Sequence, residues 1–357
     1  MKAVVKKTVR NRKAYRLTGR LRTIRRRRGT TGRRHWSLLD LTYNQAFDSG
    51  YDLGYDRGYR AGWSDREAEV QAALAQDSYD EGKHQGYLEG FEAGLEQGGD
   101  GIIDDLLPKY VILPEVSVRE VLAAGIDALQ HRMMRLLDPD EVAGRIQTAL
   151  DEGLPLNLVR LGDGELLALA QERVLPIDEV RRAGPFLPYA GLEPGDLEAR
   201  DRLAAAIRRA SIVGIPKLRK KYFQNLAFPV LAAHRIDYRR LALTDSLMNY
   251  HLYQGGHLSR LTKGRSVLTI GNLAQEMADF LRQNGVEVAG AVAPVCGVRD
   301  VDRVVADCRR FRFDLALVSA GIAAVLITDR IAFQLGKVAI DFGHLADAMV
   351  RGEAPWR

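Results

Sequence analysis

The segment 156-LNLVRLGDGELLALAQER-173 contains the pattern that decides the fold. Its first six residues, 156-LNLVRL-161, form a short apolar run that is typical of a buried strand. The last eight, 166-LLALAQER-173, are good helix formers, and the turn 162-GDGE-165 joins the two parts. The sequence therefore predicts a strand, a tight turn and a helix in direct succession.

The same succession recurs through the C-terminal part of the chain. Further strands are expected at 211–216, 265–272, 285–294, 313–321 and 337–343. Helices are expected at 139–153, 196–210, 273–283, 301–310, 322–335 and from Leu345 onward. Alternating strands and helices indicate an α/β, Rossmann-like domain over residues 138–357, with a mostly parallel sheet and right-handed crossovers. Ligands of such sheets bind at the carboxyl ends of the strands, so the candidate site residues are sought there.

An acidic turn follows the first of these strands. Asp163 and Glu165 are two residues apart and could face one Mg²⁺ or Mn²⁺ ion that also holds a diphosphate. Gly162 and Gly164 permit backbone conformations and close approaches that a side chain would block. Arg160 could pair with these acids or with phosphate. The alternative is a surface turn in which Asp163 caps the next helix.

Two other strand ends carry small residues. Gly271 and Asn272 lie between a buried strand and a helix, a place that suits an anion or a nucleotide. An ordinary strand–helix turn explains the same residues equally well. Ser319 and Gly321 follow a later strand and leave room for a ligand.

The last expected strand ends at 340-IDFGH-344. There Asp341 and His344 could act in acid–base chemistry or contact phosphate, and a purely structural role is the alternative. The chain has two cysteines, Cys296 and Cys308, which we expect to be reduced and buried, as in a cytoplasmic protein.

The basic residues are distributed unevenly. The chain of 357 residues has a net charge of +6, yet residues 1–36 contain 15 Lys and Arg and no acid. The remainder has 37 basic against 46 acidic residues. Residues 1–36 are therefore predicted to be a disordered arm that makes weak contacts with polyanions or a membrane surface. No nucleic-acid-binding motif accompanies the arm, so no specific nucleic-acid partner is expected. No long apolar run is present, which favours a cytoplasmic protein, free or held at the inner face of the membrane.

A glycine/aromatic repeat follows the arm, within residues 37–100. Glycine stands at every fourth position in 47-FDSGYDLGYDRGYRAGW-63 and again in 79-YDEGKHQGYLEGFEAGLEQG-98. A period of four is close to that of a helix, and each glycine costs about 1 kcal/mol there. Close helix–helix approach would compensate, so residues 47–98 are predicted to self-associate as helices. Disorder in the isolated chain is the alternative. Residues 101–137 form a connector, with a helical run from Val118 to Leu136.

Five motifs occur in an order that resembles one protein family. They are 158-LVRLGDGE-165, 212-IVGIP-216, 267-VLTIGN-272, 315-LALVSAGIAAVL-326 and 338-VAIDFGH-344. Together they resemble the bacterial GT-D fold glycosyltransferases, over roughly residues 138–347. The Tyr/Gly repeat also resembles N-terminal extensions of some members.

The resemblance implies transfer of glucose or a similar hexose from a UDP-sugar to a glycan, a glycoprotein or another hydroxyl acceptor, with Mn²⁺ or Mg²⁺. It gives Asp163 and Glu165 the binding of metal and diphosphate. It places Gly271 and Asn272 near the nucleotide, and Asp341 and His344 match the terminal motif, with His344 a candidate base. The turn GNLAQE and the final LADAMVRG depart from the adhesin-modifying members, so the sugar and the acceptor stay open. The alternative is a non-catalytic scaffold on a transferase-like fold, associating through the helical repeat.

Overall fold

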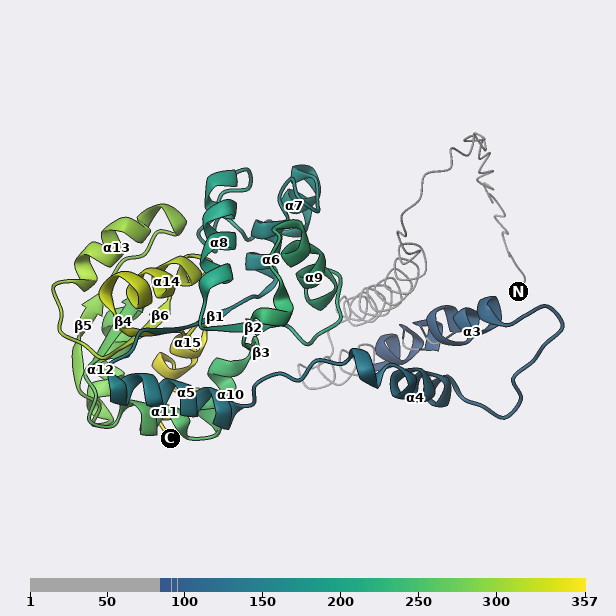
Figure 1. The fold of residues 1–357 in the computed structure, drawn as a ribbon, viewed down its shortest axis with the longest axis horizontal. Coiled ribbons are helices and arrows are strands. Elements are labelled where there is room, and N and C mark those ends of the chain that lie inside the picture. Colours follow the sequence, from purple (N-terminus) through teal and green to yellow (C-terminus); the bar gives the residue numbers. More distant parts are fainter. Residues whose placement is uncertain (1–83, 91, 95) are drawn as a thin grey trace, which may run out of the picture. The chain divides into compact units, whose positions relative to one another are not determined.

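A computed structural model describes residues 84–90, 92–94 and 96–357 (Figure 1). The chain divides into two compact units, residues 1–102 and residues 103–357. The predicted basic arm and the first run of the repeat lie outside the described residues.

The second glycine run lies in the first unit, and the structure describes part of it. Residues 84–90 and 92–94 are α-helical, and a π-helix, η2 (Glu96–Asp100), follows. Gly86 and Gly90 are buried, whereas Tyr87 and Leu88 are exposed. The helical prediction is therefore confirmed for these residues. Gly86 and Gly90 lie on the covered side of the helix, whereas Gly94 is half-buried with open space around it. Self-association through residues 47–98 stays a prediction.

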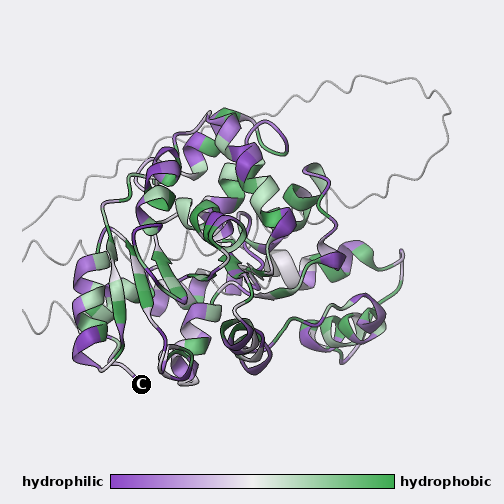
Figure 2. Ribbon diagram, turned by 60° about the vertical axis from the view of Figure 1, so that its left-hand side comes forward, coloured by the Kyte–Doolittle hydropathy of each residue, from purple (hydrophilic) through white to green (hydrophobic). Residues whose placement is uncertain are grey.

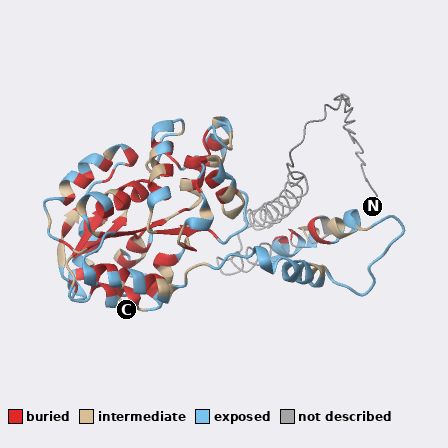
Figure 3. Ribbon diagram, in the orientation of Figure 1, coloured by how far each residue is buried: buried red, intermediate tan, exposed pale blue. Residues whose placement is uncertain are grey.

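The connector contains two short helices, α3 (Gly101–Leu106) and α4 (Val118–Ala128). Ser117 and Glu120 form a capping box that starts α4 at the predicted residue. The helix ends earlier than predicted, and a 3₁₀ turn, η3 (Gln130–Arg132), follows it. Figure 3 shows this region mostly in the colour of exposed residues. Many of its apolar side chains are exposed, namely Leu106, Tyr110, Val111, Ile112, Leu113, Val116, Leu122, Ile126, Leu129, Met133 and Met134.

A seven-stranded parallel sheet forms the centre of the second unit, in the order β3-β2-β1-β7-β6-β4-β5. The strands are β1 (Leu156–Arg160), β2 (Ile212–Ile215), β3 (Leu243–Asp245), β4 (Val267–Gly271), β5 (Val288–Val292), β6 (Leu315–Ser319) and β7 (Val338–Asp341). All six predicted strands are confirmed, and the α/β Rossmann-like class with them. The additional strand, β3, has three residues, too few to produce a periodic pattern.

Two helical layers cover the sheet, and each encloses its own apolar core. Figure 1 shows one layer on each side of the strands, and Figure 2 shows the strands as the hydrophobic interior. The first layer contains α6 (Asp163–Ala170), α7 (Ile177–Ala183), α8 (Leu197–Arg209), α9 (Gln224–Ala233), α13 (Val301–Cys308) and α14 (Ala323–Leu335). The second contains α5 (Pro139–Glu152), α10 (Met248–Gln254), α11 (His257–Thr262), α12 (Ala274–Gln283) and α15 (Leu345–Val350).

At several places along the carboxyl edge of the sheet, neighbouring strands lead into helices on opposite faces, and two of these switch points carry candidate residues. β1 and β7 are neighbours, but β1 leads into α6 of the first layer and β7 leads toward α15 of the second. In the same way, the neighbours β6 and β4 lead into α14 and α12 on opposite faces. Chains that diverge in this way leave a crevice in which ligands of open α/β sheets bind. The candidate residues of the sequence lie at these two places.

In the part of the chain that the structure describes, no helix combines the length and the apolar character that crossing a bilayer requires.

Candidate functional site

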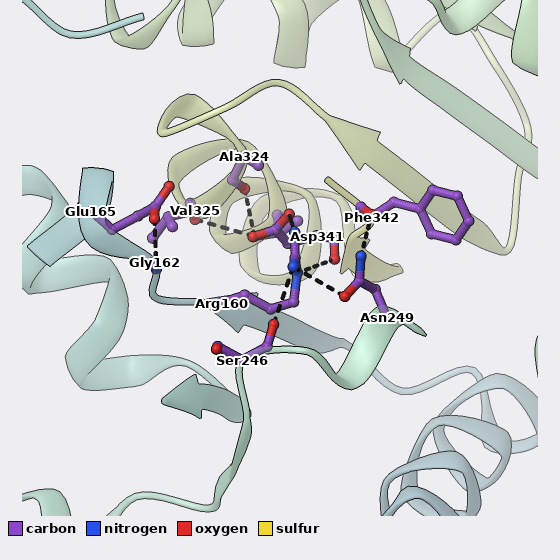
Figure 4. A network of polar contacts seen from close by, with 10 residues as sticks. Arg160, Gly162, Glu165, Ser246, Asn249, Ala324, Val325, Asp341 and Phe342 are labelled. Carbon is purple, nitrogen blue, oxygen red and sulfur yellow. Dashed lines mark hydrogen bonds and ion pairs between the residues drawn. The ribbon is translucent and has the colours of Figure 1, made fainter. Parts of the chain in front are cut away.

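Arg160, the last residue of β1, is the centre of a polar network (Figure 4). Its Nε donates to the carbonyl oxygen of Asp341 at 2.9 Å, and its Nη2 donates to Asp341 Oδ1 at 2.9 Å. Its Nη1 donates to the carbonyl oxygen of Ser246 and to Asn249 Oδ1, each at 3.1 Å. The guanidinium therefore binds together the ends of β1 and β7 and the segment after β3. Its hydrogen bonds go to these groups and not to the two acids of the turn, so that predicted pairing is wrong, and a contact with phosphate stays a prediction.

The backbone around this guanidinium is shaped to admit it. Gly343 has φ of +55°, and a Cβ there would overlap Arg160 Nη2. Asn249 Nδ2 donates to the carbonyl oxygen of Phe342 at 2.8 Å, so the chain after β7 is held on a second side. The glycine of the D-x-G-H motif is thus explained by the close approach of an arginine.

The Arg160–Asp341 pair is a buried ion pair. The two side chains are 16% and 6% exposed. Burial raises the pKa of Asp341 above its ordinary value, and the charge of Arg160 opposes that rise. Both groups have hydrogen-bonding partners, which a buried pair requires if it is not to destabilise the fold.

The acidic turn forms the start of α6. Gly162 is the N-cap residue, and Glu165 Oε2 accepts a hydrogen bond from its backbone N–H at 2.7 Å. Asp163 Oδ1 accepts from the N–H of Gly164 at 2.9 Å. Glu165 therefore reaches back to the cap, and the alternative in which Asp163 caps the helix is wrong. Both residues still belong to one turn, at the switch point between β1 and β7.

The electrostatic surroundings of Glu165 are unfavourable to its charge. Burial and the nearby carboxylate of Asp341 raise the pKa of Glu165 to about 7, and the backbone N–H donors limit the rise. Part of the residue surface remains accessible, so the crowding is at the carboxylate and does not enclose the whole side chain. An additional positive charge beside this group would stabilise its ionised form.

A segment of the chain covers part of the same edge. The N–H of Ile322 donates to the carbonyl oxygen of Ala190 at 3.1 Å, and a Cβ on Gly321 would lie 2.6 Å from that oxygen. Gly191 and Gly297 meet backbone to backbone, with a Cβ on Gly191 placed 2.6 Å from the Cα of Gly297. The room that we expected Gly321 to leave for a ligand is thus used by the protein's own backbone.

The second switch point is also closely packed. Gly271 has φ of +145°, and a Cβ on it would overlap the carbonyl oxygen of Ser319 in the neighbouring strand β6. Asn272 is exposed, and its Oδ1 accepts from the N–H of Val295 at 2.8 Å, which fastens the loop after β5. In the structure these residues shape the strand ends, and a role beside a nucleotide stays a prediction.

His344 is exposed and directly precedes α15. Its charge lies near enough to Asp341 to lower the pKa of that carboxyl. The structure therefore places it at the β1/β7 edge with the acids, as the motif order predicts, and its chemical role stays a prediction.

The donor set for a divalent cation is small. Among the described residues, no three His, Cys, Asp or Glu side chains come together as a metal centre. Asp163 and Glu165 offer hard carboxylate oxygens, and Mg²⁺ or Mn²⁺ is commonly held by one or two carboxylates together with substrate phosphates. The residues thus fit a cation that binds with a diphosphate, and they do not fit a permanently bound structural ion.

The sequence interpretation missed a basic loop on this edge. The segment 217-KLRKK-221 follows β2, which pairs with β1. A run of cations directly after a strand predicted at 211–216 was the signal that could have located it.

A hollow of about 720 Å³ lies elsewhere, at the start of α8 and beside Val298 and Arg299. None of the candidate site residues lines it. The hollow is open and lined by acids and arginines alike, so it suggests no ligand class.

The two cysteines differ. Cys308 is buried, and burial raises the pKa of its thiol to about 12. Cys296 is exposed, so the expectation that both thiols are buried is wrong for this residue. Cys296 lies in the loop after β5, outside the apolar core that surrounds Cys308.

Comparison with known proteins gives one family. The family model described as a GT-D fold-like domain matches residues 137–349. No curated protein matches the chain. A solved structure titled "The highly conserved domain of unknown function 1792 has a distinct glycosyltransferase fold" is similar at 13% identity and a TM-score of 0.42. That match covers 62% of this chain and 83% of the other. The family assignment rests on the match to the family model.

Proposed function

The chain belongs to the GT-D-like family, and from this membership we propose that it is a glycosyltransferase. The proposed reaction moves glucose or a similar hexose from a UDP-sugar to a hydroxyl of a glycan, a glycoprotein or another acceptor. The proposed cofactor is Mn²⁺ or Mg²⁺, bound together with the donor diphosphate.

One observation supports this proposal above the others. Asp163 and Glu165 lie in a single turn at the β1/β7 switch point, and the pKa of Glu165 is raised to about 7 by burial and by Asp341. Glu165 and Asp341 are two carboxylates that repel each other at the ligand-binding edge of the sheet, and a cation beside Glu165 would stabilise its charge. A surface turn would leave its acids solvated and would have no such imbalance.

Asp163 and Glu165 would hold the cation. When bound, it would neutralise charge that develops on the departing diphosphate. The N-cap hydrogen bond from Gly162 holds Glu165 Oε2, so the orientation of this carboxylate is set before any ligand arrives. Asp163 is oriented in the same way by the N–H of Gly164.

Arg160 and Asp341 are positioning residues in this proposal. Their ion pair joins the end of β1, which leads into the acidic turn, to the end of β7, which leads to His344. In the transfer itself, the acceptor oxygen bonds to the anomeric carbon, and the bond from that carbon to the diphosphate oxygen breaks. The electron pair leaves with UDP, and the acceptor proton passes to a base. His344 is the candidate for this base because it is exposed at the same edge.

A double substitution tests the proposal. Asp163→Asn with Glu165→Gln should abolish Mn²⁺-dependent binding of UDP and hydrolysis of UDP-glucose, while the circular dichroism spectrum stays unchanged. Asp138→Asn with Glu141→Gln is the matched control, because these acids form the corresponding capping box of α5 and their side chains bond to each other's backbone and to Arg135, not to candidate site residues. Unchanged turnover in the site variant would exclude the catalytic proposal. If no sugar nucleotide binds the unmodified protein, the scaffold alternative is favoured, and the exposed apolar residues of the connector are then the first surface to test.

A further inference from the structure

The loop between β2 and α9 has a strong positive charge. Lys217, Arg219, Lys220 and Lys221 are four cations within five residues, and all are exposed. We propose that this loop binds a phosphate group of the acceptor, beside the donor site. The assignment of the phosphate to an acceptor rests on the proposed function. The binding of phosphate itself rests on the loop alone.

The loop has a defined backbone. Gln224 Nε2 donates to the carbonyl oxygen of Lys217 at 3.2 Å, and Asn225 Nδ2 donates to that of Arg219 at 2.8 Å. The N–H of Gln224 donates to the carbonyl oxygen of Leu218 at 3.0 Å. Side chains at the start of α9 thus hold the loop carbonyls, and the cationic side chains of Lys217 and Arg219 point outward to solvent.

Two of these cations lack acidic partners. Lys221 pairs with Glu179 at 3.2 Å and lies over the ring of Tyr222. Arg219 Nη1 donates only to the neutral amide of Gln224, at 3.2 Å. Within the described part of the chain, neither Lys217 nor Arg219 forms an ion pair with a carboxylate. An ammonium and a guanidinium two residues apart on a fixed backbone are suited to phosphate oxygens.

The loop lies next to the candidate donor site in the sheet. The N–H of Leu161 donates to the carbonyl oxygen of Gly214 at 2.8 Å, so the ends of β1 and β2 are in contact. The chain that follows β1 contains the acidic turn, and the chain that follows β2 contains the cations. One side of β1 is thus acidic and suited to a cation with diphosphate, and the other is basic and suited to a second anion.

The residues on the far side of the acidic turn contain no such cluster of cations. The loop after β5 has one, Arg299, and it pairs with Asp196 at 3.8 Å. The segments directly after β7, β6 and β4 are 342-FGH-344, 320-AGI-322 and 272-NL-273, without Lys or Arg. A substrate group of high negative charge would therefore bind at the loop after β2, where the cations are. Leu218, 52% exposed between the cations, adds an apolar contact. A phosphate carried by a soluble acceptor and a phosphate of a lipid headgroup share this chemistry.

The test compares two charge-matched variants of the full chain. Lys217→Gln with Arg219→Gln removes the proposed site. Lys263→Gln with Arg309→Gln removes two exposed cations elsewhere and is the control. Inorganic pyrophosphate is titrated by calorimetry with EDTA present, because without a cation the acids of the donor site repel the probe. Vesicles of phosphatidylcholine, with and without phosphatidylglycerol, form the lipid arm.

Roughly tenfold weaker binding of pyrophosphate by the loop variant, with the control unchanged, is the expected result. A loss confined to the phosphatidylglycerol vesicles would support the same site with a lipid source. Equal binding by both variants in both arms would overturn the proposal. Loss of Mn²⁺-dependent UDP binding in the loop variant would also overturn it, because the loop would then belong to the donor site. If the unmodified chain does not bind UDP, the proposed function fails while the phosphate arm still tests the loop.

Discussion

Replacing Glu165 by Gln should stabilise the protein at neutral and alkaline pH. The pKa of this carboxyl is about 7 in the folded chain, against an ordinary value of 4.5. Between these two values the folded state binds more protons than the unfolded state, so the free energy of unfolding falls as the pH rises. The difference corresponds to a loss of up to about 3 kcal/mol, complete above pH 7. Glutamine cannot ionise, and its side-chain oxygen can still accept the N-cap hydrogen bond of Gly162.

The measurement is urea unfolding followed by circular dichroism, with EDTA present, between about pH 5 and pH 8. The profile of the variant should be flatter than that of the unmodified protein and lie above it at high pH. Asp341 has a raised pKa as well, so a smaller slope of the same sign should remain. Parallel profiles for the two proteins would refute the electrostatic account of the site.

Glu141→Gln provides a control of opposite sign. Glu141 has the same capping-box position in α5, but the hydrogen bonds from Asp138 and Arg135 lower its pKa. Its stabilising effect is therefore present above the ordinary pKa and lost as the pH falls. This variant should be less stable than the unmodified protein at neutral pH and match it in acid.

Three further outcomes are expected. Asp341→Asn leaves a buried guanidinium without its counter-charge and should lower the free energy of unfolding by about 3 kcal/mol or more in urea titrations; a loss within about 1 kcal/mol would mean that the pair is effectively solvated. Gly271→Ala places a Cβ against a carbonyl oxygen of β6, whereas Gly153→Ala has a similarly unusual φ but open space. The melting temperature should fall more for Gly271→Ala, and equal shifts would contradict the close strand approach. Cys296 should react with a thiol reagent in the folded protein while Cys308 reacts only after unfolding, so two fast thiols would show that the core around Cys308 opens readily.

The sheet could be predicted because its strands are short apolar runs followed by turns. The start of α5 is local in the same way, because Asp138 is its N-cap and is followed by a proline and an acid in the pattern of a capping box. Strand β3 and helices α7, α9, α10 and α11 were missed. All but α9 have seven residues or fewer, too few for a clear periodic pattern, and α9 contains Pro229 in its interior, which argues against a helix in the sequence.

The candidate residues lie at the strand ends, as the alternation of strands and helices predicts, but their contacts were not predictable. Nothing local to Arg160 indicates that its partner lies 181 residues later in the chain. The covering backbone at Ala190 was hidden for the same reason, because the small size of Gly321 suggests space and does not reveal what fills it. Long-range partners of single side chains depend on the complete fold, whereas the strands themselves and the parallel class of the sheet follow from local pattern.

The bonds of Arg160 also bear on how the protein is made. Synthesis produces β1 first among the seven strands of the sheet, yet β7, its neighbour in the centre of the sheet, is the last of the seven to leave the ribosome. Until then β1 has one edge without a strand, and its terminal guanidinium lacks the Asp341 carboxylate. A nascent chain therefore cannot complete the middle of its sheet, and strands that stay open for so long are exposed to wrong pairing. Completion of the domain thus depends on the C-terminal segment, which makes premature termination costly to the whole sheet.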